Sequence, residues 1–242
     1  MKAKLIVAVA AALVLAGWMA GTARAVDFTL TGSQPLTVNT AYGKGWLYNQ
    51  SKAWVVLGGS VSNELYTRDS STLYVSGGSV NTLFAQDTST VYVSDGDIGN
   101  VVYAHQYSTV EVTGGYIGSM VTYDHSQASF SDQTLGFLVT HDTSIVDISN
   151  GTLIDLKAYE TSKVTLHGYN FQATGGLSIA GDEVLGMGVL SGKWFDGTEW
   201  TIPISAHNTG ATISLVTPEP ATLSLLAVSG ILLLKRRRKP TA

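Results

Sequence analysis

The sequence predicts an all-β protein whose main part is a parallel β-helix, or β-solenoid, with about six to seven coils of about 18 residues. Three observations predict this fold. A short motif recurs at a fixed spacing, apolar residues alternate with polar ones after each motif, and a turn pair that contains glycine follows most of the alternating stretches.

The recurring motif is seven residues long. It opens on an apolar residue, carries Ala or Thr at its third position and an acid or amide at its fifth, and closes on Ser. It occupies Leu65–Ser71, Leu83–Ser89, Val102–Ser108, Met120–Ser126, Leu138–Ser144 and Leu156–Ser162. The closing serines lie 18 or 19 residues apart. Such a period indicates stacked structural repeats.

A short strand is expected after each closing serine. Alternation places Leu73 and Val75 on the inner face and Tyr74 on the outer face. Turn pairs such as Gly77-Gly78 and Asp95-Gly96 follow, where the chain needs positive φ. Coils stacked at about 4.8 Å bury the inner residues in one continuous core.

We expect the solenoid to be right-handed, by analogy with the rule for parallel crossovers. A left-handed helix is the alternative. It usually shows a hexapeptide period, and the inward positions of this chain do not follow one.

Residues 1–25 are typical of a secretory signal peptide, with an apolar stretch after Lys2 and Lys4 and a cleavage site that includes Ala23 and Ala25. Residues 26–50 are expected to cap the open end of the solenoid, and residues 51–168 carry its repeats. Residues 169–215 are expected to form a C-terminal β cap, with Asp196-Gly197 as a hairpin turn.

The charge balance excludes one class of partner. Eight of the 14 Lys and Arg but only one of the 18 Asp and Glu lie in the signal peptide and the C-terminal tail. The remaining chain therefore carries six basic and 17 acidic residues, a net charge near −11. Binding to nucleic acid requires a basic surface, so no nucleic acid is expected as a partner. Cysteine is absent, so export would not bring disulfides.

The tail, residues 216–242, contains Pro218-Glu219-Pro220, an apolar membrane segment at 221–234, and a basic cluster with Arg236, Arg237 and Arg238. It resembles the PEP-CTERM sorting domain of exported bacterial proteins. The resemblance implies recognition by an exosortase-type membrane protease and a transient C-terminal transmembrane helix in the inner membrane. The protein would then reach the cell surface or extracellular matrix of a Gram-negative-type bacterium. A mainly apolar segment of fourteen residues is short for a stable span, and the basic cluster favours a cytoplasmic C-terminus.

Acids recur at the fifth position of the motif. Asp69, Asp87, Asp124 and Asp142 are candidate calcium ligands, since Ca²⁺ binds carboxylate oxygens. Each coil supplies only one acid, so we expect these side chains instead to cap backbone N–H groups at a corner, as do the closing serines. No metal or other cofactor is predicted.

An outward stripe of aromatic and hydrogen-bonding residues is a candidate glycan site. Its members are Tyr66, Phe84, Tyr103, His105, Tyr123, His141 and Tyr159. Such residues in register suit contact with an extracellular polysaccharide, although aromatic residues also pack across strands for stability alone.

No catalytic residues are predicted. Coils this uniform leave no loop insertion to build a cleft, and no nucleophile–base order is present. The sequence therefore predicts an exported, non-enzymatic surface or matrix protein with a structural or adhesive role. A carbohydrate-binding or polysaccharide-degrading β-helix protein is the alternative.

Overall fold

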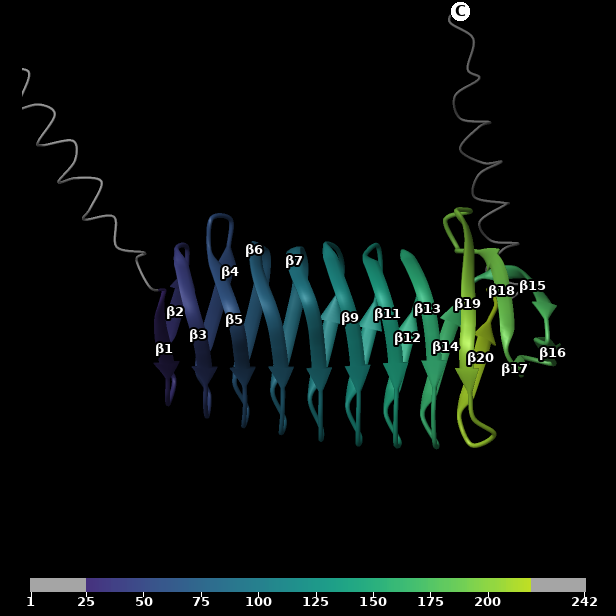
Figure 1. Ribbon diagram of the computed structural model, residues 1–242, viewed down its shortest axis with the longest axis horizontal. Helices are drawn as coiled ribbons and strands as arrows, with labels where there is room; N and C mark the ends of the chain where they lie inside the picture. The colour runs from purple at the N-terminus through teal and green to yellow at the C-terminus, as the bar shows by residue number, and fades with distance from the viewer. Residues whose placement is uncertain (1–24, 219–242) are drawn as a thin grey trace, which may run out of the picture.

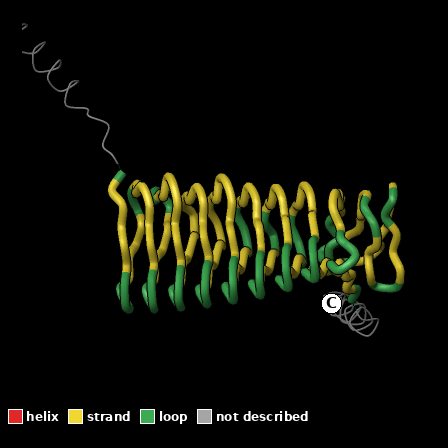
Figure 2. Tube along the Cα trace, turned by 60° about the horizontal axis from the view of Figure 1, so that its bottom comes forward, coloured by secondary structure: helices red, strands yellow, loops and turns green. Residues whose placement is uncertain are grey.

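The chain forms a rod of stacked β-coils, which Figure 1 shows from the side and Figure 2 shows as a winding backbone trace. This computed structural model describes residues 25–218, which contain twenty strands and no helix. Strands of successive coils pair in parallel, and the solenoid makes about eight turns, more than the six to seven predicted. The β-solenoid prediction is confirmed.

Two ladders of parallel strands run the length of the rod. The long-strand ladder consists of β1 (Val26–Leu30), β3 (Ala41–Leu47), β5 (Ser60–Thr67), the second halves of β6 (Thr72–Ala85) and β7 (Thr90–Ala104), β9 (Tyr116–Thr122), β11 (Thr134–Thr140), β13 (Thr152–Ala158) and β19 (Glu199–His207). The short-strand ladder consists of β2 (Pro35–Val38), β4 (Lys52–Val56), the first halves of β6 and β7, β8 (Thr109–Val112), β10 (Gln127–Phe130), β12 (Ile145–Ile148), β14 (Lys163–His167) and β20 (Thr212–Val216).

The core lies between the two ladders. Inner residues of equivalent position stack directly, as in the pairs Leu83–Val102, Met120–Leu138 and Leu138–Leu156. All of these side chains are fully buried. The outward residues Tyr74 and Tyr92 are half-buried and pair with each other, so the alternation expected for the strand after each serine is confirmed.

Residues 26–50 form coil strands that join the ladders, because β1 pairs with β3 and β2 pairs with β4 in parallel. The sequence shows no register there because an inner leucine is missing. Gly45 occupies the position that Leu65 fills in the next coil. The Phe28 ring lies against Gly45, where an added Cβ would be 2.6 Å from its Cε1.

Residues 169–198 interrupt the coil with antiparallel strands, visible beyond the last coils in Figure 1. They are β15 (Tyr169–Gly175), β16 (Ser178–Ala180), β17 (Glu183–Leu185) and β18 (Gly188–Lys193). β18 pairs with β19 and β17 pairs with β20. These two strands therefore cover the C-terminal edges of both ladders. The hairpin predicted at Asp196-Gly197 joins β18 to β19.

Adjacent residues of β11 test the inner and outer faces. Leu138 is fully buried, whereas the neighbouring Phe137 is 48% exposed. We expect Leu138→Ala to lower the free energy of unfolding by about 2–5 kcal/mol, because it leaves a cavity in the core. Phe137→Ala should lower it by less than about 1 kcal/mol. Urea titration measures both values, and equal losses would contradict this assignment of the faces.

Candidate functional site

The predicted aromatic stripe exists on the outer face of the long-strand ladder and continues onto the adjoining turns. Its rings form one uninterrupted series of eight: Trp46, Tyr66, Phe84, Tyr103, His105, Tyr123, His141 and Tyr159. Neighbouring ring centroids lie 4.6–6.2 Å apart, and their planes are within 26° of parallel. The structure therefore brings all seven predicted residues together, and it adds Trp46.

The ring series follows two files, or rows of equivalent outward positions, and it passes from one file to the other at its middle. From Trp46 to Tyr103 the rings stand on paired strand positions, and from His105 to Tyr159 they stand on the first residue of the turn. Tyr103 and His105 belong to the same coil, and their ring centroids are 6.2 Å apart. Beyond this step the strand file continues with Val121. The spacing of the motif predicts both files but not the contact that joins them.

Stacking has a consequence for ligand binding. A sugar ring binds to an aromatic side chain over the open face of the ring. In this series the faces meet the rings of the next coils, as for Tyr123 with His105 at 4.7 Å and His141 at 4.9 Å. All eight residues are half-buried. The stripe thus presents mainly ring edges and polar atoms to solvent, and its ring faces stabilise the contacts between coils.

A second stack lies on the short-strand ladder and was missed by the sequence analysis. Trp54, Tyr74 and Tyr92 stack with centroids 5.5 and 5.1 Å apart. The outward alternation of Tyr74 and Tyr92 was visible in the sequence. The Trp54 position was not, since no motif copy precedes Ser51.

The recurrent acids occupy the apex of each turn, where they adopt an unusual backbone conformation. Asp69, Asp87, Asp124 and Asp142 have φ between 54° and 57°, in the left-handed region. Asn49, Gln106 and Glu160 at equivalent positions have φ of 57°, 60° and 56°. Asp and Asn tolerate this region better than most residues other than glycine, which explains why Asp fills four of the six fifth positions of the motif.

Each apex side chain also binds the neighbouring coil. Oδ2 of Asp124 accepts the backbone N–H of Gln106 at 2.9 Å, and Oδ2 of Asp142 accepts that of Asp124 at 3.0 Å. The same bond recurs from Asn49 to Asp142, where the acceptor is Glu160. The expectation that these acids cap backbone N–H groups at a corner is confirmed. We call this series the apex ladder.

The candidate calcium ligands do not form an assembled metal site in the described residues. In residues 25–218 no three His, Asp or Glu side chains are placed so that they could hold a metal ion together. The apex carboxylates of Asp69, Asp87, Asp124 and Asp142 are instead acceptors for backbone N–H groups.

The closing serines lie inside the turns, fully buried. Ser71 Oγ accepts the backbone N–H of Arg68 at 3.0 Å, and Ser89 Oγ accepts that of Gln86 at 3.1 Å. In later coils the hydroxyl donates instead, as from Ser162 to the Tyr159 carbonyl at 2.8 Å. Serine is small enough for the interior of every turn. Its hydroxyl bonds the backbone of its own turn at Ser71, Ser89, Ser144 and Ser162, whereas the hydroxyls of Ser108 and Ser126 are buried there without a hydrogen-bond partner.

Two histidines of the stripe lie beside carboxylates of the apex ladder. His141 Nδ1 is 3.3 Å from Glu160 Oε2, and His105 Nδ1 is 4.0 Å from Asp124 Oδ2. Burial lowers the pKa of His105, and the nearby Asp124 and Asp142 carboxylates only partly offset this effect. His105 is therefore disposed to remain neutral within the stack.

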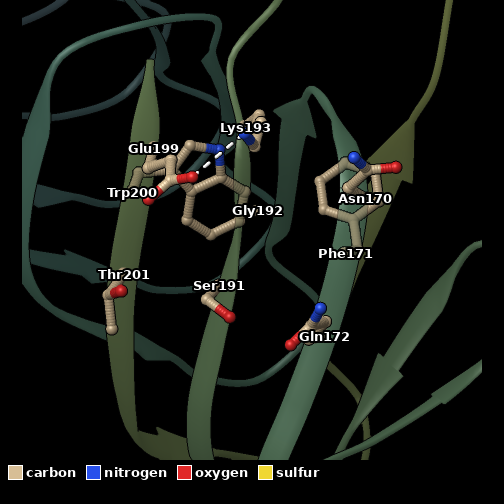
Figure 3. Close-up of a pocket in the computed structure, with 9 residues that line it drawn as sticks. All are labelled: Asn170, Phe171, Gln172, Ser191, Gly192, Lys193, Glu199, Trp200 and Thr201. Carbon is tan, nitrogen blue, oxygen red and sulfur yellow. Dashed lines mark ion pairs between the residues drawn. The ribbon is translucent and has the colours of Figure 1, made fainter. Parts of the chain in front are cut away.

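A polar hollow on β15, β18 and β19 was not anticipated from the sequence (Figure 3). Its lining residues are Asn170, Phe171, Gln172, Ser191, Gly192, Lys193, Glu199, Trp200 and Thr201. Lys193 Nζ is 3.0 Å from Glu199 Oε1 across its rim, and this contact raises the pKa of Lys193. The lining offers hydrogen-bonding groups and contains no histidine, cysteine or aspartate.

The sorting residues lie mostly outside the described part of the chain. Pro218 is its last residue, and Glu219, Pro220, the apolar segment and Arg236–Arg238 follow it. Ala23 of the cleavage site precedes it, and Ala25 is its first residue. Within residues 25–218 there is no helix with the length and apolar character needed to cross a membrane. Comparison of the chain with protein-family models, curated proteins and solved structures found no match in any of the three.

Substitution of Asp124 tests the apex ladder. Asp124→Ala removes the acceptor for Gln106 N–H and puts a Cβ-bearing residue without local hydrogen bonding at φ 56°. We expect a loss of about 1–3 kcal/mol in the free energy of unfolding. Asp124→Asn keeps an acceptor and should lose less than half of that. A denaturant titration compares them, and equal losses would show that the side-chain oxygen is not stabilising.

The pH dependence of stability tests the environment of His105. Its folded pKa lies below the unfolded value of about 6.5, so the unfolded chain binds more protons near that pH. The free energy of unfolding should therefore decrease as the pH falls through about 6.5 towards the folded pKa. His105→Tyr, which places in this file the residue found at Tyr123, should remove that part of the decrease.

His125→Tyr at an exposed turn position is the matched control, and urea titrations over a pH series give the comparison. An unchanged pH dependence in His105→Tyr would contradict the assignment.

Proposed function

We propose that this chain is an exported, non-enzymatic rod that serves as a structural or adhesive component of the bacterial surface or extracellular matrix. One observation carries the proposal: the repeated side chains of the coils are used to hold one coil to the next. The rings stack on the rings of the next coil, and the apex acids accept backbone N–H groups of the neighbouring coil. A surface built in this way favours rigidity over catalysis.

The ends of the chain supply the proposed destination. We propose that residues 1–25 direct export and that Pro218-Glu219-Pro220, with the apolar segment and Arg236–Arg238, directs processing by an exosortase-type protease at the inner membrane. The rod is then placed outside the membrane. The rule for parallel crossovers supports a right-handed coil.

Adhesion would use the flat faces and edges of the rod. The aromatic stripe offers ring edges, hydroxyl groups and imidazoles over several coils, so a long polysaccharide could make many weak contacts at once. The net charge near −11 favours neutral sugars. Because the ring faces are occupied by neighbouring rings, this geometry supports the structural role more strongly than the carbohydrate-binding alternative.

The sorting part of the proposal is tested in a host that has an exosortase-type protease. We expect Glu219→Ala, and separately loss of Arg236–Arg238, to leave the full chain unprocessed in the inner membrane, since both alter the motif that the resemblance assigns to recognition. Glu111→Ala, which removes one exposed carboxylate from the rod, is the matched control. Cell fractionation and surface protease treatment locate each variant. Delivery of both tail variants to the surface at the rate of the control would overturn the sorting proposal.

A further inference from the structure

Asn150 and Gly151 form a coil corner at which the side chain lies close to the following backbone. The corner connects β12 to β13, and Gly151 N–H donates to Asn150 Oδ1 at 2.7 Å. This bond places the Gly151 nitrogen near the side-chain carbon Cγ of Asn150. Gly151 has φ 108°, a backbone conformation that residues other than glycine rarely adopt. It is the one Asn-Gly pair in the sequence.

The other end of the Asn150 amide holds the β18–β19 hairpin. Asn150 Nδ2 donates to Asp196 Oδ2 at 3.2 Å, across 46 residues of sequence. Asp196 also accepts the backbone N–H of Thr198 at 2.8 Å, and this bond is the main reason why the pKa of Asp196 is lowered. Asn150 therefore faces an ionised carboxylate.

We propose that Asn150 is a site of spontaneous deamidation, and that the conversion releases the Asp196 end of the hairpin from the coil. The Gly151 nitrogen bonds to Asn150 Cγ and gives up its proton to solvent. The bond between Cγ and Nδ2 breaks, and the nitrogen takes up a proton from solvent and leaves as ammonia. Water then opens the succinimide ring at one of its two carbonyl carbons, giving aspartate or isoaspartate.

Two features of the corner support this reaction. The fold holds the nucleophilic nitrogen beside the carbon that it attacks, and such proximity raises the rate of an intramolecular step. Glycine adds no side chain to shield the approach. Asn150 itself is half-buried, so water can reach it.

The effect on the rod would be local. The equivalent corner three coils earlier is Asp95-Gly96, where Gly96 N–H donates to Asp95 Oδ1 at 2.8 Å. The fold thus accepts an aspartate at this corner. What changes is the contact with the hairpin, because a donor to Asp196 becomes a second carboxylate that repels it. The hairpin keeps its other tie, from Trp194 Nε1 to the Gly151 carbonyl at 3.0 Å.

The first experiment incubates the full chain at neutral pH and maps its peptides by mass spectrometry, with heavy-oxygen water labelling each new carboxyl group. We expect Asn150 to convert about tenfold faster than the exposed residues Asn63 and Asn170. The same chain unfolded in urea gives the rate due to the Asn-Gly sequence alone, and we expect the folded rate to equal or exceed it. Conversion no faster than at the control residues, or slower than in urea, would overturn the proposal.

The second experiment measures the consequence by hydrogen exchange. Asn150→Asp carries the charge of the product, and it should raise exchange severalfold in the hairpin around Asp196. Asn63→Asp makes the same charge change at an exposed position in β5 and should leave the hairpin unchanged. Equal exchange in the two variants would contradict the release of the hairpin.

Discussion

In each coil from Asn49 to Asp142, the apex residue donates its backbone N–H to the side chain of the apex residue in the next coil. Both residues of each such pair lie in the left-handed region. The arrangement sets the rest of the solenoid. It fixes where the long strand ends and the short strand begins, and it fixes each coil in register with the next. With the register fixed, Leu83, Val102 and Met120 fall over one another and the two ladders enclose a continuous core. A shift by one residue would turn these side chains to solvent.

The outer face follows from the same constraint. Because coils repeat at the strand spacing, side chains at one outward position lie about 4.8 Å from their neighbours. This distance is slightly larger than the thickness of an aromatic ring, so aromatic residues in register can lie face to face. The eight-ring series and the Trp54–Tyr74–Tyr92 stack are therefore products of the period as much as of the residues. The polar hollow lies where antiparallel strands replace the coil.

Most of the coil was predictable because its signals are local and repeated. The alternation at Leu73 and Val75, the role of the apex acids, and seven of the eight rings of the stripe all came from the spacing of one motif. The first coils were harder to predict. Gly45 stands where the next coil has Leu65, the Phe28 ring lies against it, and no repeat marks either residue. The pairing of β17 and β18 with the last coil was not predictable either, because contacts such as Asn150–Asp196 span long stretches of sequence that share no periodic pattern.

The direction of the backbone hydrogen bonds also determines how such a rod bears force. The bonds between coils run along the rod axis, whereas the covalent chain winds around it (Figure 2). A pull on the two ends therefore loads the hydrogen bonds along their own length, and it reaches one coil interface after another. The interfaces act in series, so the weakest of them sets the tension at which the chain begins to unwind. When one interface yields, one coil unwinds and the distance between the two ends increases by the extended length of that coil. A rod of this construction therefore extends in steps while the coils beyond the break stay folded.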